Sequence, residues 1–349
     1  MIIYVTSSGG GTGNYPVNRS LYFLKTDSLR YNLGDLEIDI ATLIGILDRG
    51  GSSGKLHRLY GGIPVGDIRQ AVAAFSRLSD DPDFLRQLGY RGPQNGDHPS
   101  GNLILDSIFR GLRDDQKLEG VELLRQYSKM VQERFQLVGR IIPIAIPNGG
   151  ELYAEFEREG RVVGEDKIDE LEEKGVPLIR DPKTVYRVGT TLPIKANPEA
   201  IERLRKSNLV IGSPGSIVTS QAQNYSIQGI PAALQGIPLY LVLNLVKPQK
   251  RRKGPIDCTD DVGFICHLMG RPPDGVIINS REPSRGVQDA YGRKNMWLAC
   301  YDEGELREMG IGDIVYADVA METEDKQGPL FRHDPEKLAP VFADLIRRL

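Results

Sequence analysis

Cysteine is scarce in this sequence, with three cysteines among 349 residues. Cys258, Cys266 and Cys300 are too few and too widely spaced for a disulfide framework or a zinc cluster, even with His267 next to Cys266. We therefore expect reduced thiols in a cytoplasmic protein.

An excess of charge is also missing, because 44 basic and 47 acidic residues leave a formal net charge of −3. This balance gives no general attraction to nucleic acid polymers or anionic membranes, so any anion site must be local. No apolar run approaches membrane-spanning length. Residues 1–5 lack the basic region of a secretory signal and predict a strand.

Three apolar segments end directly in loops rich in glycine and serine. Residues 2–6 run into 7–13, residues 38–47 run into 48–56, and residues 208–212 run into 213–224. In an open parallel sheet, ligands bind outside the carboxyl ends of the strands, so the three loops can converge on one crevice. We predict an α/β fold: one domain over residues 1–349 with a Rossmann-like three-layer core and a mostly parallel sheet.

The first two loops resemble phosphate-binding motifs without matching the common ones. Asn14 stands where the third glycine of G-x-G-x-x-G belongs, so the dinucleotide fingerprint fails. Only three residues separate Gly50 from Gly54, and Leu56 occupies the Ser/Thr position of a Walker A motif. A strand, a glycine turn and a helix still place phosphate at a helix N-terminus.

The second loop offers donors and carboxylates. Ser52, Ser53 and Lys55 suit an anion, although a glycine-rich surface turn with a solvated lysine is the alternative interpretation. Asp48 and Asp67 flank this loop and could share a Mg²⁺ ion, which binds carboxylates together with phosphate oxygens and water. Capping of the helix that follows is the simpler role for Asp67.

Residues 139–192 change from helical to alternating periodicity. We expect a β-hairpin of 140–146 with 151–157, and treat 139–192 as an antiparallel insert on the parallel core. Asn244 lies near the end of a further core strand, and a basic cluster follows at 247–253. Periodicity predicts other helices near 68–75, 102–112, 118–135, 198–206, 262–269, 284–291 and after 334, and strands near 185–188, 275–279 and 312–317.

Taken in chain order, these motifs resemble the CofD/YvcK superfamily, and more closely its YvcK-like branch of gluconeogenesis-factor proteins. The matches span nearly the whole chain: 9–13, Asp48 with 50–56, 66–69, His98 with 101–103, 214–216, 219–220, Asn224, Asn244, and 332–333. The chain departs from the pattern at Arg49 and at 14–19, where the usual apolar helix is replaced and an extended segment is expected up to Asp35.

The resemblance implies a core that binds a nucleotide diphosphate across its strand ends. YvcK-like proteins are associated with UDP-sugar binding and with regulation of carbon flow into cell-wall precursors and of cell shape. CofD proteins are transferases that join 2-phospho-L-lactate to the deazaflavin Fo, with GMP as the leaving nucleotide and Mg²⁺ required. A homodimer is also expected from the resemblance.

The expected site residues follow from these motifs. Under the transferase interpretation, Asp48 and Asp67 would be catalytic and would hold Mg²⁺. Asn224 and Asn244 are candidates for contacts with the base or sugar. The other nucleotide-binding candidates are Gly10, Gly11, Thr12, Gly13, Ser52, Ser53, Lys55, Asn102, Ser213, Gly215, Ser216, Thr219 and Ser220.

Overall fold

The computed structural model describes residues 1–47, 50–181, 185–248, 254–325 and 328–349. Asp48 and Arg49, and the 249–253 part of the basic cluster, lie outside the described residues. Hypotheses about the Asp48 carboxylate therefore stay predictions.

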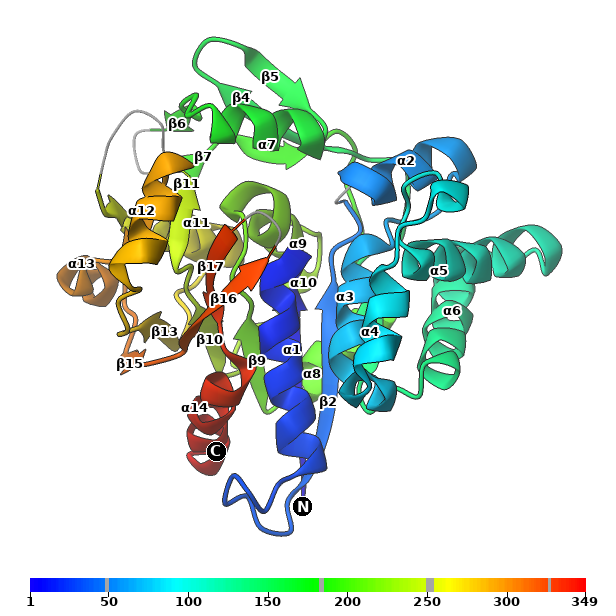
Figure 1. Ribbon diagram of the computed structural model, residues 1–349, viewed down its shortest axis with the longest axis horizontal. Coiled ribbons are helices and arrows are strands. Elements are labelled where there is room, and N and C mark those ends of the chain that lie inside the picture. The colour runs from blue at the N-terminus through cyan, green and yellow to red at the C-terminus, as the bar shows by residue number, and fades with distance from the viewer. Residues whose placement is uncertain (48–49, 182–184, 249–253, 326–327) are drawn as a thin grey trace.

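A parallel sheet of seven strands forms the centre of the molecule (Figure 1). Its strand order is β15-β13-β10-β9-β1-β2-β3, and every neighbouring pair is parallel. The strands are β1 (Ile2–Gly9), β2 (Glu37–Ile44), β3 (Arg140–Pro143), β9 (Leu209–Gly212), β10 (Leu239–Val242), β13 (Gly275–Asn279) and β15 (Asp313–Ala317). The chain builds outward from β1 in one direction and from β9 in the other, so the topology reverses between β1 and β9.

Helices cover both faces of the sheet because the strand side chains alternate. In β2, Ile38 and Ile40 join one apolar core, while Ala41 and Leu43 join the other. The first core includes α1 (Gly11–Thr26), α3 (Gly66–Phe75), α5 (Ser100–Arg110), α6 (Gly120–Arg134) and α14 (Pro335–Arg347); the second includes α8 (Pro198–Lys206), α10 (Ile230–Ala233) and α11 (Thr259–Met269). The predicted three-layer α/β fold is confirmed.

Smaller elements surround this core. The remaining α-helices are α2 (Gly51–Tyr60), α4 (Pro82–Gly89), α7 (Glu165–Glu173), α9 (Gln223–Tyr225), α12 (Arg285–Arg293) and α13 (Glu303–Glu308), and the short 3-10 and π helices are η1 (Arg77–Asp80), η2 (Pro93–Asn95), η3 (Gly111–Asp115) and η4 (Ile217–Ala222). The short strands are β4 (Leu152–Phe156), β5 (Gly160–Val163), β6 (Arg180–Asp181), β7 (Val185–Tyr186), β8 (Val188–Thr190), β11 (Val246–Pro248), β12 (Ile256–Asp257), β14 (Met296–Cys300), β16 (Ala320–Asp325) and β17 (Gly328–His333). Within the described ranges, no helix has the length and apolar character needed to cross a membrane.

The segment after the first glycine loop corrects one expectation. Residues 11–26 form α1, with Pro16 inside it, so a helix does follow the glycine turn and continues to Thr26, where an extended segment was expected after the departure at 14–19. Polar side chains on its buried face explain the difference. Ser7 donates to Asn18 Oδ1 at 2.5 Å, and Ser213 donates to Asn14 Oδ1 at 2.7 Å. Because these buried amides have hydrogen-bond partners in the strands and loops, the helix needs no continuous apolar stripe there.

The expected hairpin of 140–146 with 151–157 is also wrong. β3 lies in the central sheet, parallel to β2, and residues 152–156 pair instead with β5 and β8 in an antiparallel sheet. Ile141 and Ile142 are both buried, which suits a parallel strand covered on both faces, here the edge strand beside β2, better than a hairpin with one exposed face. The antiparallel part of the insert therefore begins at β4, and it carries α7 above the strand ends (Figure 1).

Candidate functional site

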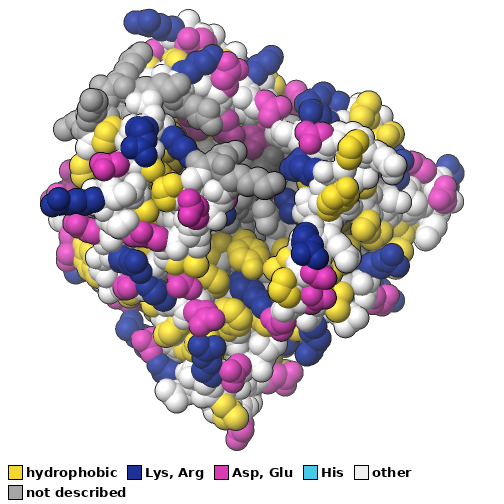
Figure 2. All heavy atoms as spheres, in the orientation of Figure 1, with side chains coloured by type: hydrophobic (Ala, Val, Ile, Leu, Met, Phe, Trp, Pro, Cys, Tyr) yellow, Lys and Arg dark blue, Asp and Glu magenta, His cyan; other side chains and the backbone are white. Residues whose placement is uncertain are grey.

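A large cavity opens at the point where the sheet topology reverses. It has a volume of about 1050 Å³, and Thr12 after β1, Gly215 after β9 and Asn244 after β10 all line it. Ligands of open α/β sheets bind at this kind of crevice, outside the carboxyl ends of the strands. The face shown in Figure 2 is hollowed between the lobe that carries α2 and the part that carries α12, with charged side chains around the opening.

The loop from β1 to α1 requires glycine because other parts of the chain approach it closely. A Cβ on Gly13 would lie 2.1 Å from the carbonyl oxygen of Pro214, and a Cβ on Gly10 would lie 2.4 Å from Asp67 Oδ2. Gly11 begins α1 with a φ of 64°. The N-terminus of α1, where backbone N–H groups and the helix dipole favour anions, therefore lies at the cavity.

The loop after β9 is held in place by Asn244. The side-chain amide of Asn244 accepts from the Gly215 N–H at 2.9 Å and donates to the Gly215 carbonyl at 2.8 Å. Ser216 accepts from the Thr219 N–H at 3.1 Å. Asn244 thus positions the loop. The oxygen and nitrogen of its side-chain amide, which we expected to contact a base or sugar, each form a hydrogen bond with the Gly215 backbone.

Charged groups contributed by other elements complete the cavity wall. Lys247 forms an ion pair with Asp261, and Tyr186 donates to that carboxylate at 2.8 Å. Burial acts to lower the pKa of Lys247, but Asp261 outweighs it, so the pKa is raised. Burial raises the pKa of the Glu172 carboxyl to about 7, against the effect of Lys247. Burial lowers the pKa of His333 to about 4, so this imidazole is neutral at pH 7.

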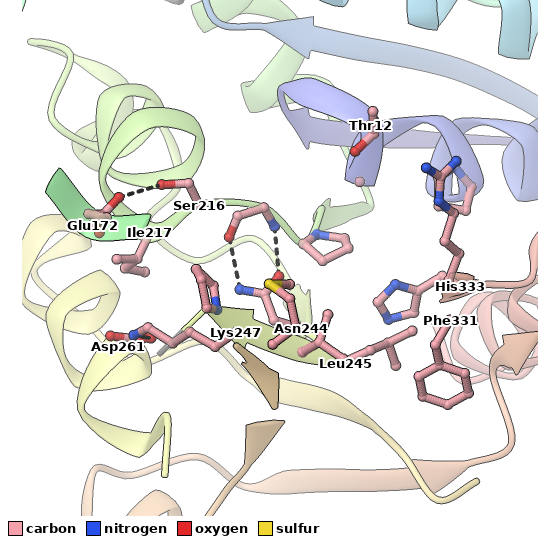
Figure 3. Close-up of a pocket in the computed structure, with 18 of the residues that line it drawn as sticks. Thr12, Glu172, Ser216, Ile217, Asn244, Leu245, Lys247, Asp261, Phe331 and His333 are labelled. Atoms are coloured by element: carbon pink, nitrogen blue, oxygen red, sulfur yellow. Dashed lines mark hydrogen bonds and ion pairs between the residues drawn. The ribbon is translucent and has the colours of Figure 1, made fainter. Parts of the chain in front are cut away.

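The cavity has a polar side and an apolar side. Figure 3 shows Glu172 and Ser216 on one side of the cavity, and Thr12, His333 and Phe331 on the other. Leu245, Met296, Met321 and Phe331 supply apolar lining. These residues come from β10, β14, β16 and β17 or lie next to them. Such an arrangement suits a ligand with an anionic group and a less polar portion.

The second glycine loop forms a separate polar cluster. Ser52 Oγ lies 2.8 Å from His98 Nδ1 and accepts from the Asn102 amide at 3.1 Å, and Arg69 donates to Asn102 Oδ1 at 2.9 Å. Ser53 accepts from the Gly66 N–H at 2.8 Å. None of these side chains is among those that line the large cavity.

Several predicted site residues lie in places that the sequence did not indicate. Lys55 is exposed on α2. Asn224 is buried, donates to Ser8 Oγ at 3.3 Å, and does not line the cavity. Ser213 hydrogen-bonds to Asn14, and the Ser220 side chain packs against Gly215, where an added Cβ would lie 3.0 Å from Ser220 Cβ. Of the loop residues expected to bind nucleotide, Thr12, Gly13, Gly215 and Ser216 line the cavity.

The capping role considered for Asp67 is not the observed one. Val65 is the N-cap of α3, and Asp67 lies buried in its first turn beside Gly10. Pro99 is the N-cap of α5, and Asn102 is bonded to Ser52 and Arg69. One buried carboxylate beside the α1 loop fits the donor set of Mg²⁺, which binds one or two carboxylates with phosphate oxygens. In the described part of the chain, no group of three or more metal-ligating side chains comes together.

Sequence reasoning missed the contribution of the insert and of the β16–β17 hairpin. Glu172, Asp261 and Phe331 carry no motif. Lys247 and Pro248 fall in the basic cluster, and Arg332 and His333 fall in the match at 332–333. An acidic helix between glycines, at 165–173, was the available signal for Glu172.

Comparisons with known proteins find similarity along nearly the whole chain. The family model described as "2-phospho-L-lactate transferase CofD" matches residues 5–319. The gluconeogenesis factor of Bacillus subtilis (strain 168) is 26% identical, with 97% of this chain and 96% of that protein covered. The gluconeogenesis factor of Halalkalibacterium halodurans is also 26% identical, with 96% and 94% covered.

A solved structure shares the fold. The crystal structure of a UPF0052 family member from Bacillus halodurans has a TM-score of 0.77 and 21% sequence identity, and the match covers 98% of this chain and 98% of that chain. At this level of identity the likeness shows the fold alone.

Proposed function

Since the chain belongs to the 2-phospho-L-lactate transferase CofD family, we propose that it binds a nucleotide diphosphate, most favourably a UDP-sugar, as a regulator of carbon flow into cell-wall precursors. The observation that carries the proposal is the cavity between the N-terminus of α1 and the loop at Gly215, at the reversal point of the sheet. Full-length relatives named gluconeogenesis factor support the regulatory role.

The proposed ligand pose follows from the polarity of the wall. The diphosphate lies against the α1 N-terminus at Thr12 and Gly13 and against the Gly215–Ser216 backbone, where N–H groups and hydroxyls are the natural phosphate donors. Lys247 supplies positive charge nearby, although Asp261 neutralises part of it. If a Mg²⁺ ion accompanies the diphosphate, Asp67 is the described carboxylate that would hold it, together with Asp48.

The proposal is tested by a thermal-shift and calorimetry panel of UDP, UDP-N-acetylglucosamine, GDP, GTP, ADP and NAD, each with and without Mg²⁺. A ligand at a hundred times its Kd raises the free energy of unfolding by about 2.7 kcal/mol, which is readily measured. We expect UDP-N-acetylglucosamine to give the largest shift without a requirement for metal.

A matched pair of variants locates the binding. Arg332 is exposed and lines the cavity, whereas Arg134 is exposed at the end of α6 and does not. We expect Arg332→Gln to weaken UDP-N-acetylglucosamine binding about tenfold, because a charge-assisted contact contributes roughly 1.4 kcal/mol or more. Arg134→Gln should leave the Kd unchanged. Absence of nucleotide binding by folded protein would overturn the proposal. A guanine-specific, Mg²⁺-dependent shift would favour a transferase and call for an assay of Fo with lactyl-diphosphoguanosine.

A further inference from the structure

The helix α7 of the insert contacts two glycine- and serine-rich loops through four carboxylates. At its N-terminal end, Glu165 Oε2 accepts from the Gly50 N–H at 2.9 Å, and Asp166 Oδ1 accepts from the Gly51 N–H at 3.1 Å. At the other end, two further carboxylates reach the loop after β9.

Of these further contacts, the one between Glu172 and Ser216 lies at the edge of the cavity. Asp169 Oδ1 accepts from Thr219 Oγ1 at 3.1 Å, and Glu172 Oε2 accepts from Ser216 Oγ at 3.4 Å. Figure 3 shows the contact between Glu172 and Ser216 beside the cavity. One short acidic helix thus joins the loop that starts α2 to the loop after β9.

The groups that α7 contacts are the kinds that bind phosphate in proteins. Backbone N–H groups at a helix N-terminus and loop hydroxyls donate to carboxylate and phosphate oxygens alike. The N-cap residue of α2 is Gly50, which has no side chain with which to cap the helix. Glu165 and Asp166 of α7 supply the negative charge there instead. Carboxylate and phosphate therefore compete for the same donors, and a donor that is bonded to α7 cannot serve a ligand at the same time.

The attachment of α7 to the rest of the protein has little apolar content. Ile168 is its one fully buried side chain among those described, and Leu171 packs only partly against the core. Glycines with positive φ flank the helix, Gly164 at 94° and Gly175 at 70°. Since glycine adopts such angles without steric cost and tolerates changes of φ and ψ, the two positions can act as hinges.

We propose that α7 is an anionic lid, whose carboxylates hold the phosphate donors of the two loops and are displaced when a phosphate-bearing ligand binds. The proposal rests on the proposed function, since Ser216 lies in the cavity proposed for the diphosphate. Gly50, Gly51 and Thr219 lie outside the cavity lining, and their donors are released together with Ser216 because one helix holds all four. The ligand must then replace the α7 carboxylates as the acceptor of these hydrogen bonds. Each carboxylate contact that α7 keeps lowers the fraction of molecules whose donors can bind the ligand, and so weakens the apparent affinity.

Neutral variants of the carboxylates test the exchange by calorimetry, with UDP-N-acetylglucosamine and inorganic pyrophosphate as the two probes. We expect Asp169→Asn/Glu172→Gln to tighten the Kd of pyrophosphate by about five- to tenfold relative to the wild type. Glu170→Gln is the matched control, because Glu170 is an exposed carboxylate of the same helix that pairs with Lys174 and contacts neither loop. Its Kd should stay within about twofold of the wild-type value.

Hydrogen exchange reports the movement of α7 directly. In the wild type, saturating pyrophosphate should speed amide exchange across 165–173, because the helix loses its contacts as the ligand gains them. Slower exchange with ligand, or weaker binding by the double variant, would overturn the lid, since α7 would then close on the ligand and assist it.

The two proposals fail in different ways. If pyrophosphate binds, and binds more tightly to the double variant, while no nucleotide binds to any variant, the nucleotide proposal fails and the lid stands. If nucleotide binds equally to the wild type and the double variant, the lid fails alone. If neither probe binds to any folded variant, both fail.

Discussion

Asn244 shows how one side chain can hold a loop in place at the wall of the cavity. Its amide faces the backbone of Gly215 with both of its hydrogen-bonding ends, at 2.9 Å and 2.8 Å. Tyr301 in turn donates to the carbonyl oxygen of Asn244 at 3.1 Å. The loop after β9 is therefore fixed to the end of β10, the next strand in the sheet.

Replacing Asn244 by alanine should cost stability and binding together. Two lost hydrogen bonds predict a decrease of about 1–3 kcal/mol in the free energy of unfolding, measured by urea denaturation. Because the Gly215 backbone is no longer fixed, the Kd for UDP-N-acetylglucosamine should rise in calorimetry. Gln116→Ala, at an exposed amide far along the chain, is the control. Unchanged stability in Asn244→Ala would mean that the clamp is not maintained in solution.

Glu172 should make the stability of the protein depend on pH. Burial raises its pKa from 4.5 to about 7, with Lys247 acting against it and Asp169 and Asp261 with it. Between these values the folded state binds more protons than the unfolded chain, so the contribution of Glu172 to stability falls as the pH rises. We expect Glu172→Gln to remove this fall. The melting temperature of the variant minus that of the wild type should therefore increase from about pH 5 to about pH 8.

The difference between variant and wild type isolates this group from others that titrate nearby. Burial lowers the pKa of His333 to about 4, so its titration lowers the stability of the protein as the pH falls. This effect is the same in the variant and the wild type, and it cancels in the difference between their melting temperatures. In Glu170→Gln the carboxyl removed has its pKa lowered by Lys174, so no gain is expected as the pH rises. A constant difference between Glu172→Gln and the wild type would contradict the prediction.

At the scale of elements, the contact between α1 and the loop after β9 is the closest in the site. A methyl group on Gly13 would lie 2.1 Å from the Pro214 carbonyl oxygen, and the obstacle is backbone rather than a flexible side chain. The start of α1 and this loop can therefore approach each other only through glycine, which sets the width of the anion site between them.

Gly13→Ala should separate the two elements. Overpacking of this kind costs about 1–3 kcal/mol of folding stability and displaces the α1 N-terminus from the diphosphate. Urea denaturation should show the loss, and calorimetry should show weaker binding of UDP-N-acetylglucosamine. Gly286→Ala in α12 is the control, because no atom lies within 4 Å of the added Cβ. A Gly13→Ala protein as stable and as active in binding as the wild type would refute the close approach.

The elements also show where prediction from sequence succeeds and where it stops. The strands predicted at 275–279 and 312–317 occur as β13 and β15. The apolar run of β13 identifies a buried parallel strand, whereas β15 is a partly exposed edge strand. The helix at α1 was missed because its buried face carries Asn14 and Asn18. Its polar residues have partners distant in sequence, which no local pattern displays.

The same limit applies to the candidate site. The glycine loops could be predicted, because glycine next to a buried strand has a local physical cause. That Asn244 bonds the loop after β9, and that Glu172 joins the wall, depends on how distant segments meet. The second loop was grouped with the others, yet Ser52 faces His98 and Asn102 in a cluster of its own.

At the scale of the whole molecule, Arg203 fastens one helical layer to the sheet. This α8 side chain is fully buried and pairs with the Asp39 carboxylate of β2. It also donates to Thr6 Oγ1 at 2.8 Å, to the Val5 carbonyl at 2.9 Å and to the Asp39 carbonyl at 2.7 Å. One guanidinium thus links α8 to two adjacent central strands.

Arg203→Met should destabilise the whole fold by about 3 kcal/mol, because acceptors in β1 and β2 are left unpaired in a buried place. The loss should appear as a lower urea midpoint with one cooperative transition. Arg205→Met, at an exposed position of the same helix, should change stability by no more than about 0.5 kcal/mol. Equal stability of the two variants would show that the buried network contributes nothing net.

The packing of α14 on α1 has a consequence for how the protein is made. Ser20 in α1 donates to the Pro335 carbonyl at 2.9 Å, across a separation of 315 residues, and Leu338 and Phe342 are buried in the core that α1 shares. During synthesis, α1 leaves the ribosome long before α14 does. The part of its apolar surface that α14 covers then stays exposed until that later helix emerges, while α3 and the sheet cover the rest. The nascent chain is therefore a natural client of chaperones, and ribosome stalling before Pro335 is a hazard for aggregation.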